Sequence, residues 1–235
     1  MKKLLVIIFT LLVSANADVV QNQQIYAASN VVKSFGCDGN RSLIEAVKHA
    51  KAVAILTDVK KIGFIASVQS GEGVFSMRDM NGEWTSPIMI RYKGFGVGAQ
   101  AGIESRDIIV LFQTSKSFQD IFEGSDTLEL NAGASVGEGY GSGIATDLPD
   151  MSAWTVSPGE VTGIYAGVSL DFGRFTIDNQ ATYDYYGRIY DYEDILNGSP
   201  KDSRYTKIFK NTLKTYLGGD VENFQCNIDK FIIEN

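Results

Sequence analysis

The distribution of glycine is the sequence feature that most constrains the fold. Eighteen of the 24 glycines lie between Gly63 and Gly173, and the segments between them alternate apolar and polar residues with a period of two. Such alternation is typical of strands with one buried face. Over residues 94–103 the apolar positions alternate mainly with glycine, which predicts a curved strand that another element crosses closely. The middle of the chain is therefore predicted to form a sheet.

A β-hairpin is the clearest local prediction within this region. Strands are expected at Val74–Arg78 and Ile88–Tyr92, joined through a turn at Asp79–Gly82 that carries the Asn-Gly signal of hairpins. Pro87 stands at the start of the second strand, where proline is tolerated. Further strands are predicted over residues 107–113, 127–134 and 161–172, a short helix over 115–122 and a long loop over 136–158.

Helices are predicted on both sides of the strands. Residues 20–35 place apolar side chains at three- and four-residue steps before Gly36, namely Ile25, Ala28, Val31, Val32 and Phe35. A second helix starts at the capping box Ser42–Glu45, and a last one opens at Ser199–Pro200 and stops at Gly218. Helices that flank strands without regular βαβ alternation predict an α+β domain with a mainly antiparallel curved sheet.

Residues 1–17 have the pattern of a signal peptide. Lys2 and Lys3 precede an apolar run over 4–13, and Ala15-Asn16-Ala17 is the small-x-small sequence of a cleavage site. The run is short for a permanent span of a ~30 Å hydrocarbon core, although an anchor that stays attached is the alternative. The expected organisation is a signal peptide (1–17), one domain (18–219) and a C-terminal tail (220–235). We therefore expect a periplasmic or secreted protein.

Export bears on the two cysteines, Cys37 and Cys226. An oxidising compartment favours a disulfide between them, which would tie the tail to the N-terminal segment, and two unpaired thiols are the alternative.

The net charge is −7, and residues 1–17 contribute +2, which leaves −9 on the remainder. A chain this acidic, with Lys60-Lys61 as its longest basic run, is not expected to bind nucleic acid. Lipid binding would need a local basic patch or apolar insertion.

Few groups in the sequence could support catalysis. His49 is the single histidine, and no Gly-x-Ser-x-Gly elbow is present. Two distant cysteines and one histidine do not make a zinc site, and no EF-hand spacing occurs. Residues 94–99 match Gly-x-Gly-x-x-Ala, but no helix is predicted after them to receive a pyrophosphate. Two acid clusters, Asp147/Asp150 and Asp191/Glu193/Asp194, are interpreted as solvated loop charge rather than acid–base pairs. We predict no catalytic residues, no metal and no cofactor.

A spaced series of residues resembles the SYLF family of lipid-binding proteins. The resemblance covers roughly residues 27–217 and includes the glycine-rich stretch and the aspartate-led strand that starts at Asp107. Its hallmark positions, which we interpret as structural, are Gly71, Gly73, Arg78, Gly82, Trp84, Pro87, Gly167, Tyr186 and Gly187. The loop after Val136 departs from the family by lacking its usual Gly-Pro.

The resemblance implies binding of membrane lipids, and an anionic phospholipid is the expected ligand. Headgroup contacts are predicted for Lys60, Lys61, Arg91 and Lys93, whose neighbouring segments are poor in acids. Ordinary solvated surface cations are the alternative for these residues. The N-terminal helix either inserts in a membrane or packs on the sheet, because Lys33 is its only base between residues 18 and 35. Actin, which some fungal relatives bind, is not expected to meet an exported chain. The competing hypothesis is a structural or protein-interaction module of the envelope that binds no lipid.

Overall fold

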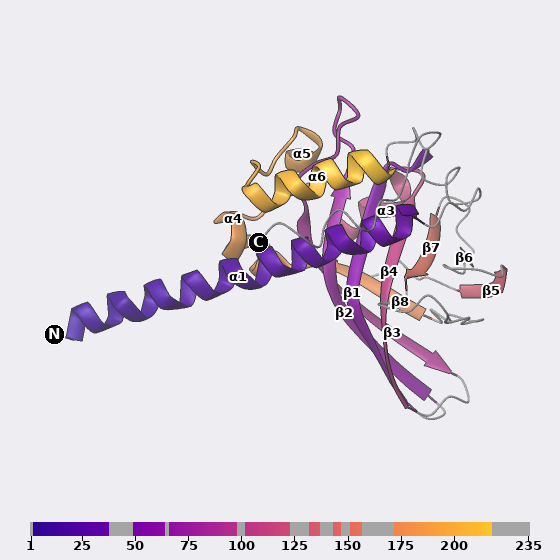
Figure 1. Ribbon diagram of the computed structural model, residues 1–235, viewed down its shortest axis with the longest axis horizontal. Helices are drawn as coiled ribbons and strands as arrows, with labels where there is room; N and C mark the ends of the chain where they lie inside the picture. Colours follow the sequence, from indigo (N-terminus) through magenta and orange to yellow (C-terminus); the bar gives the residue numbers. More distant parts are fainter. Residues whose placement is uncertain are drawn as a thin grey trace.

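The strands form one antiparallel sheet with helices on both faces (Figure 1). The computed structural model describes residues 2–37, 49–63, 66–97, 102–122, 132–136, 143–146, 151–156 and 172–217. Its elements are α1 (Lys2–Cys37), β1 (Ala52–Gly63), β2 (Ala66–Met77), β3 (Ile88–Val97), β4 (Gly102–Phe112), α3 (Lys116–Phe122), β5 (Ala132–Val136), β6 (Gly143–Thr146), β7 (Met151–Val156), β8 (Phe172–Ile177), α4 (Asn179–Tyr186), α5 (Tyr192–Leu196) and α6 (Arg204–Leu217). The strand order is β5-β6-β7-β4-β1-β2-β3-β8. The predicted α+β class is confirmed.

The central strand β1 is buried on both faces over its first half. It pairs with β2 on one side and with β4 on the other. Ala52 through Leu56 are each 0% exposed, so this run has no polar face. Alternation directs Val53 and Ile55 to one helical layer and Ala54 and Leu56 to the other. A strand that is apolar at every position needs cover on both sides, and the two helical layers supply it.

Helices α1 and α6 pack side by side on one face of the sheet (Figure 1). The predicted apolar stripe of α1, Ile25 to Phe35, is buried there against Val53 and Ile55, together with Phe209 and Leu213 of α6. The structure therefore decides between the two alternatives for this stretch, because the stripe packs on the sheet. The opposite face carries an aromatic cluster: Phe75, Phe112, Phe118, Phe122 and Tyr192, from β2, β4, α3 and α5.

Three sequence predictions about element boundaries were wrong. The expected loop over 136–158 contains β6 and β7, and β7 pairs with β4 along the sheet. Gly36 does not end the first helix, because α1 continues to Cys37 and Tyr216 packs where a Cβ of Gly36 would lie. Ser199–Pro200 does not open the last helix, which begins at Arg204. There the hydroxyl of Ser203 accepts a hydrogen bond from the amide of Thr206 at 3.2 Å.

Several other predictions fall outside the described residues. These are the second helix up to residue 48, the strand over 127–131, most of the strand over 161–172, and the tail from residue 218. Cys226 belongs to this group, so its disulfide with Cys37 stays a prediction. Helix α1 runs through residue 17 without a break, and cleavage there also stays a prediction. Within the described ranges, no helix has the length and apolarity that crossing a bilayer requires.

Strand β2 approaches β1 so closely that only glycine fits at position 73. A Cβ on Gly73 would overlap the backbone carbonyl oxygen of Ile55 and lie 2.9 Å from the Cα of Leu56. At Gly71 a Cβ would meet the Cγ2 methyl of Val59 at 2.7 Å. The backbone of a paired strand cannot move aside, whereas a side chain can shift. The Gly-x-Gly pair is therefore a packing requirement of the sheet.

Replacing Gly73 with alanine is expected to lower the free energy of unfolding by about 3 kcal/mol or more, at the upper end of overpacking costs. Gly71→Ala is the matched comparison and should cost about 1 kcal/mol, since the closest atom is a side-chain methyl and the nearest backbone atom, the Cα of Val59, is 3.2 Å away. Urea unfolding followed by circular dichroism measures both values. Equal costs for the two variants would contradict the proposed close approach at Gly73.

Candidate functional site

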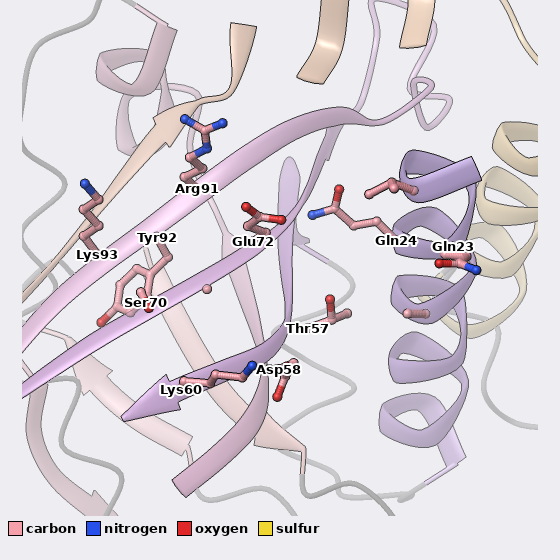
Figure 2. A pocket seen from close by; sticks show the side chains of 13 residues that line it. Gln23, Gln24, Thr57, Asp58, Lys60, Ser70, Glu72, Arg91, Tyr92 and Lys93 are labelled. Carbon is pink, nitrogen blue, oxygen red and sulfur yellow. Dashed lines mark ion pairs between the residues drawn. The ribbon is translucent and has the colours of Figure 1, made fainter. Parts of the chain in front are cut away.

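A groove lies between α1 and the adjoining segments of β1, β2 and β3 (Figure 2). It has a volume of about 550 Å³. Its lining residues are Val20, Gln23, Gln24 and Ala27 of α1, Thr57, Asp58 and Lys60 of β1, Ser70, Gly71 and Glu72 of β2, and Arg91, Tyr92 and Lys93 of β3. We call this space the α1 groove. Residues 20–27 in the middle of α1 form one wall, and the sheet forms the floor.

Three of the four cations predicted from sequence meet in the α1 groove. Lys60, Arg91 and Lys93 come from β1 and β3 and line it together. Register explains the grouping, because Lys60 pairs with Ser70, and Ser70 pairs with Lys93 across β2. Lys61 is not among the lining residues, since successive strand residues point to opposite faces. The headgroup contact predicted for Lys61 therefore stays a prediction.

A β-bulge at Asp58 sets the direction of Lys60. Between Thr57 and Lys60, β1 holds one more residue than the facing stretch of β2, and Asp58 has a left-handed φ of 56°. The side chain of Ser105 donates a hydrogen bond to Asp58, and this bond holds the pKa of that carboxyl below its usual value. The Asp58 amide in turn donates to Oδ1 of Asp107 at 2.9 Å. Burial raises the pKa of Asp107.

Two of the three groove cations already have carboxylate partners. Lys60 Nζ lies 3.3 Å from Oδ2 of Asp58, and both side chains are well exposed. Arg91 lies 2.6 Å from Oδ2 of Asp178, whose side chain is only 7% exposed. Asp178 also caps α4 by accepting a hydrogen bond from the amide of Ala181 at 3.1 Å. Arg91 therefore stabilises the junction between β3 and α4, besides facing the groove.

Lys93 is the groove cation that is best placed to contact a ligand. It is exposed, and among the described residues no ion pair involves it. The groove also holds the carboxylates of Asp58 and Glu72 and the amides of Gln23 and Gln24. Three cations and two acids line the groove among hydrogen-bonding groups, and a third acid, Asp178, pairs with Arg91 from outside the lining. Such a lining suits a polar group that carries negative charge and also accepts hydrogen bonds.

Apart from Gly71, which also lines the groove, the described hallmark residues serve the fold. Arg78 lies over the ring of Trp84, with its guanidinium carbon 4.4 Å from the ring centroid, and it donates to the backbone oxygen of Gly82 at 2.8 Å. Gly82 has a φ of 80° in the hairpin turn. Three further hallmark residues, Pro87, Tyr186 and Gly187, join β3 to α4. The Tyr186 hydroxyl donates to the Pro87 carbonyl at 2.6 Å, and Gly187 ends α4 in the left-handed conformation. Gly167 lies outside the described residues.

The groups considered for catalysis do not meet at the groove. His49 is exposed and is not among the groove residues. Asp191 and Asp194 form the capping box of α5, and Asp194 pairs with Arg188 at 2.7 Å. Those acids are therefore structural, and Asp147 and Asp150 lie outside the described residues. In the part of the chain that the structure describes, no three His, Cys, Asp or Glu side chains gather as a metal-ligand set.

Sequence reasoning missed the other residues of the groove. Gln23 and Gln24 were not singled out, and Asp178 was not identified as a helix cap. The signal for Asp178 was present, since an aspartate before a short amphipathic run is a typical N-cap. No local signal marks Thr57, Ser70 or Glu72, because their grouping depends on strand register and on where α1 packs.

Comparison with protein families gives a match over more than half of the chain. The family model described as "Ysc84: Las17-binding protein actin regulator" matches residues 93–216. An SH3 domain-containing protein of Schizosaccharomyces pombe is 32% identical over 127 residues, which cover 52% of this chain and 29% of the relative. SH3 domain-containing YSC84-like protein 1 of Homo sapiens is 30% identical over 138 residues, or 58% of this chain and 40% of the relative. The chain thus spans less than half of these relatives. No solved structure matches it.

Arg91 and Lys93 are expected to respond differently to removal of their charge. Arg91→Ala leaves the buried Asp178 without its counter-charge and should lower the free energy of unfolding by about 1–2 kcal/mol. Lys93→Ala is the matched control and should change it by no more than about 0.5 kcal/mol, as is usual for exposed residues. Urea unfolding measures both. A larger cost for Lys93 than for Arg91 would contradict these assignments.

Asp107→Asn is expected to flatten part of the pH dependence of stability. Burial raises the pKa of Asp107, so the folded state holds this proton more tightly than the unfolded chain does. The protonated Asp107 side chain therefore stabilises the folded state. This contribution is fully present at pH values below its ordinary pKa of 3.8, and it is lost as the pH rises through the raised pKa of the folded state. Asparagine keeps an acceptor for the Asp58 amide but does not titrate. Urea midpoints from about pH 3.5 to about pH 6.5 test this difference, and parallel profiles for wild type and variant would contradict it.

Proposed function

Because the chain belongs to the Ysc84 family, whose domain is the SYLF domain, we propose that it is a non-catalytic protein that binds anionic phospholipid at an envelope membrane. The observation that supports this proposal is the α1 groove, which Lys60, Arg91 and Lys93 line on one face of the sheet. A phosphate-bearing headgroup would find cations and hydrogen-bond donors there. Lys60, Arg91 and Lys93 are exposed, as side chains that meet a membrane must be.

The packing of α1 restricts how a membrane can be reached. Its apolar stripe from Ile25 to Phe35 is buried on the sheet, so that stripe is not available for insertion. The net charge of the chain also opposes attraction to an anionic surface at a distance. We therefore assign the contact to the local cations of the groove rather than to the bulk charge or the apolar face of the helix.

The proposed envelope location depends on export, which rests on the pattern of residues 1–17. The family description names an actin regulator, and an exported chain would not meet actin. The competing role is a protein-interaction module that binds no lipid. Isolation of one stoichiometric protein partner, with no lipid retained, would favour that role.

The double variant Lys60→Gln/Lys93→Gln tests the groove directly. Each lysine near an anionic surface contributes about 1 kcal/mol, so binding to phosphatidylglycerol vesicles should weaken about 30-fold at low salt. Lys201→Gln/Lys207→Gln is the matched control, because it removes the same charge from the exposed region around the start of α6. Vesicle co-sedimentation provides the affinities. If both double variants weaken vesicle binding equally, the effect comes from the bulk charge and not from the groove. If the wild type binds neither phosphatidylglycerol nor phosphatidic acid vesicles, the proposed function is overturned.

A further inference from the structure

Exposed apolar side chains form a row across the end of the sheet. Ile62 on β1, Val68 on β2 and Phe95 on β3 are 56%, 63% and 49% exposed. Ile62 pairs with Val68, and Val68 pairs with Phe95, so the three side chains are neighbours on one face. We call these three residues the apolar row.

A second row, of basic side chains, lies two residues from the apolar row, on the side away from the strand ends. Lys60 pairs with Ser70, Ser70 with Lys93, and Lys93 with Arg174 on β8. Lys60, Lys93 and Arg174 are exposed, and we call them the basic row. Two residues along a strand correspond to about 6.6 Å. Residues two apart share a face, so the apolar row and the basic row lie side by side on the face that also carries the α1 groove.

The apolar row lies toward the ends of the strands, and the basic row lies nearer to the helices. Figure 1 shows the ends of β1, β2 and β3 projecting beyond α1 and α6. A flat surface can therefore approach this end of the sheet without meeting the helical layer first. From that surface inward, the order is apolar side chains, then cations, then the groove.

We propose that this end of the sheet inserts into an anionic lipid bilayer, with the apolar row in the interface and the basic row at the phosphates. The inference rests on the proposed function and adds the mode of contact. Interfacial segments bury their apolar face about 5–10 Å into the boundary between headgroups and acyl chains. The separation of the two rows matches that depth. Exposed apolar side chains rimmed by polar ones mark an interaction site.

Charge favours a bilayer over a second copy of the chain. A two-fold contact through the apolar row would bring the basic rows of both copies close together, and like charges oppose such an arrangement. An anionic bilayer instead neutralises the basic row at the same time as it buries the apolar row. An anionic bilayer can therefore contact the apolar row and the basic row at the same time.

Vesicle binding of the variant Val68→Ser/Phe95→Ser tests the insertion. Both side chains are exposed, so the variant should keep the unfolding midpoint of the wild type. Its affinity for vesicles of phosphatidylglycerol and phosphatidylcholine should fall at least tenfold. Met80→Ser/Ile189→Ser is the matched control, because Met80 and Ile189 are 73% and 52% exposed and lie outside the two rows. The control should bind as the wild type does.

Fluorescence locates the contact independently of affinity. The tryptophan fluorescence of the Val68→Trp variant should be quenched by vesicles with brominated acyl chains, whereas the added fluorescence of the Met80→Trp variant should not be quenched. The wild type, with Trp84 and Trp154, provides the background. Equal quenching at positions 68 and 80 would overturn the insertion. Wild-type affinity of Val68→Ser/Phe95→Ser would overturn it while leaving the proposed function in place.

Two other outcomes identify a different occupant or a different function. A lipid-free dimer in sedimentation velocity that dissociates in Val68→Ser/Phe95→Ser would overturn the insertion and assign the apolar row to a second copy. Failure of the wild type to bind phosphatidylglycerol or phosphatidic acid vesicles at low salt would overturn the proposed function, and the insertion with it.

Discussion

The bulge at Asp58 in β1 is the constraint on which the rest of the arrangement depends. Before the bulge, β1 is buried on both faces, and Leu56 faces the aromatic side of the sheet. The extra residue returns Val59 to that same side and places Lys60 on the side of α1. In a regular strand the alternation would direct Val59 toward the groove and Lys60 into the apolar core. One inserted residue thus separates the doubly buried half of the sheet from the half with a polar face.

The chain keeps stability and recognition in different places. The hallmark residues build the hairpin, the close contact between β1 and β2 and the junction with α4, and they do not supply the exposed cations of the groove. Arg91 belongs to both groups, because it faces the groove and pairs with the buried Asp178. The exposed rows at the ends of the strands contribute little to the core. Substitutions in these rows should therefore leave the fold unchanged.

The structural features that the sequence predicted most accurately are those that depend on a local pattern of residues. The stripe from Ile25 to Phe35 and the turn at Gly82 follow from short-range periodicity and turn chemistry, and both are present. Strands β6 and β7 were missed because their segments are rich in Gly, Ser and Asp, and their strand character depends on pairing with β4. Lys61 was grouped with Lys60 because adjacent residues look equivalent in a sequence, although a strand separates them by face.

The groove itself could not be predicted, because it depends on where α1 packs and on the register of three strands. Sequence identified Lys60, Arg91 and Lys93 one by one as cations in acid-poor segments, and the structure brings them together. The apolar row has the same origin, since Ile62, Val68 and Phe95 are isolated apolar residues until pairing makes them neighbours. The rows and the groove together suggest a membrane contact that uses the sheet rather than the N-terminal helix.

Neutron reflectometry of the chain on supported bilayers tests that contact most directly, because it reports both adsorption and orientation. On a bilayer that contains phosphatidylglycerol, we predict adsorption with the ends of β1, β2 and β3 in the headgroup layer and α5 and α6 away from it. On pure phosphatidylcholine at the same salt concentration, we predict little adsorption. Equal adsorption on both bilayers, or an orientation with α6 against the lipid, would contradict the account.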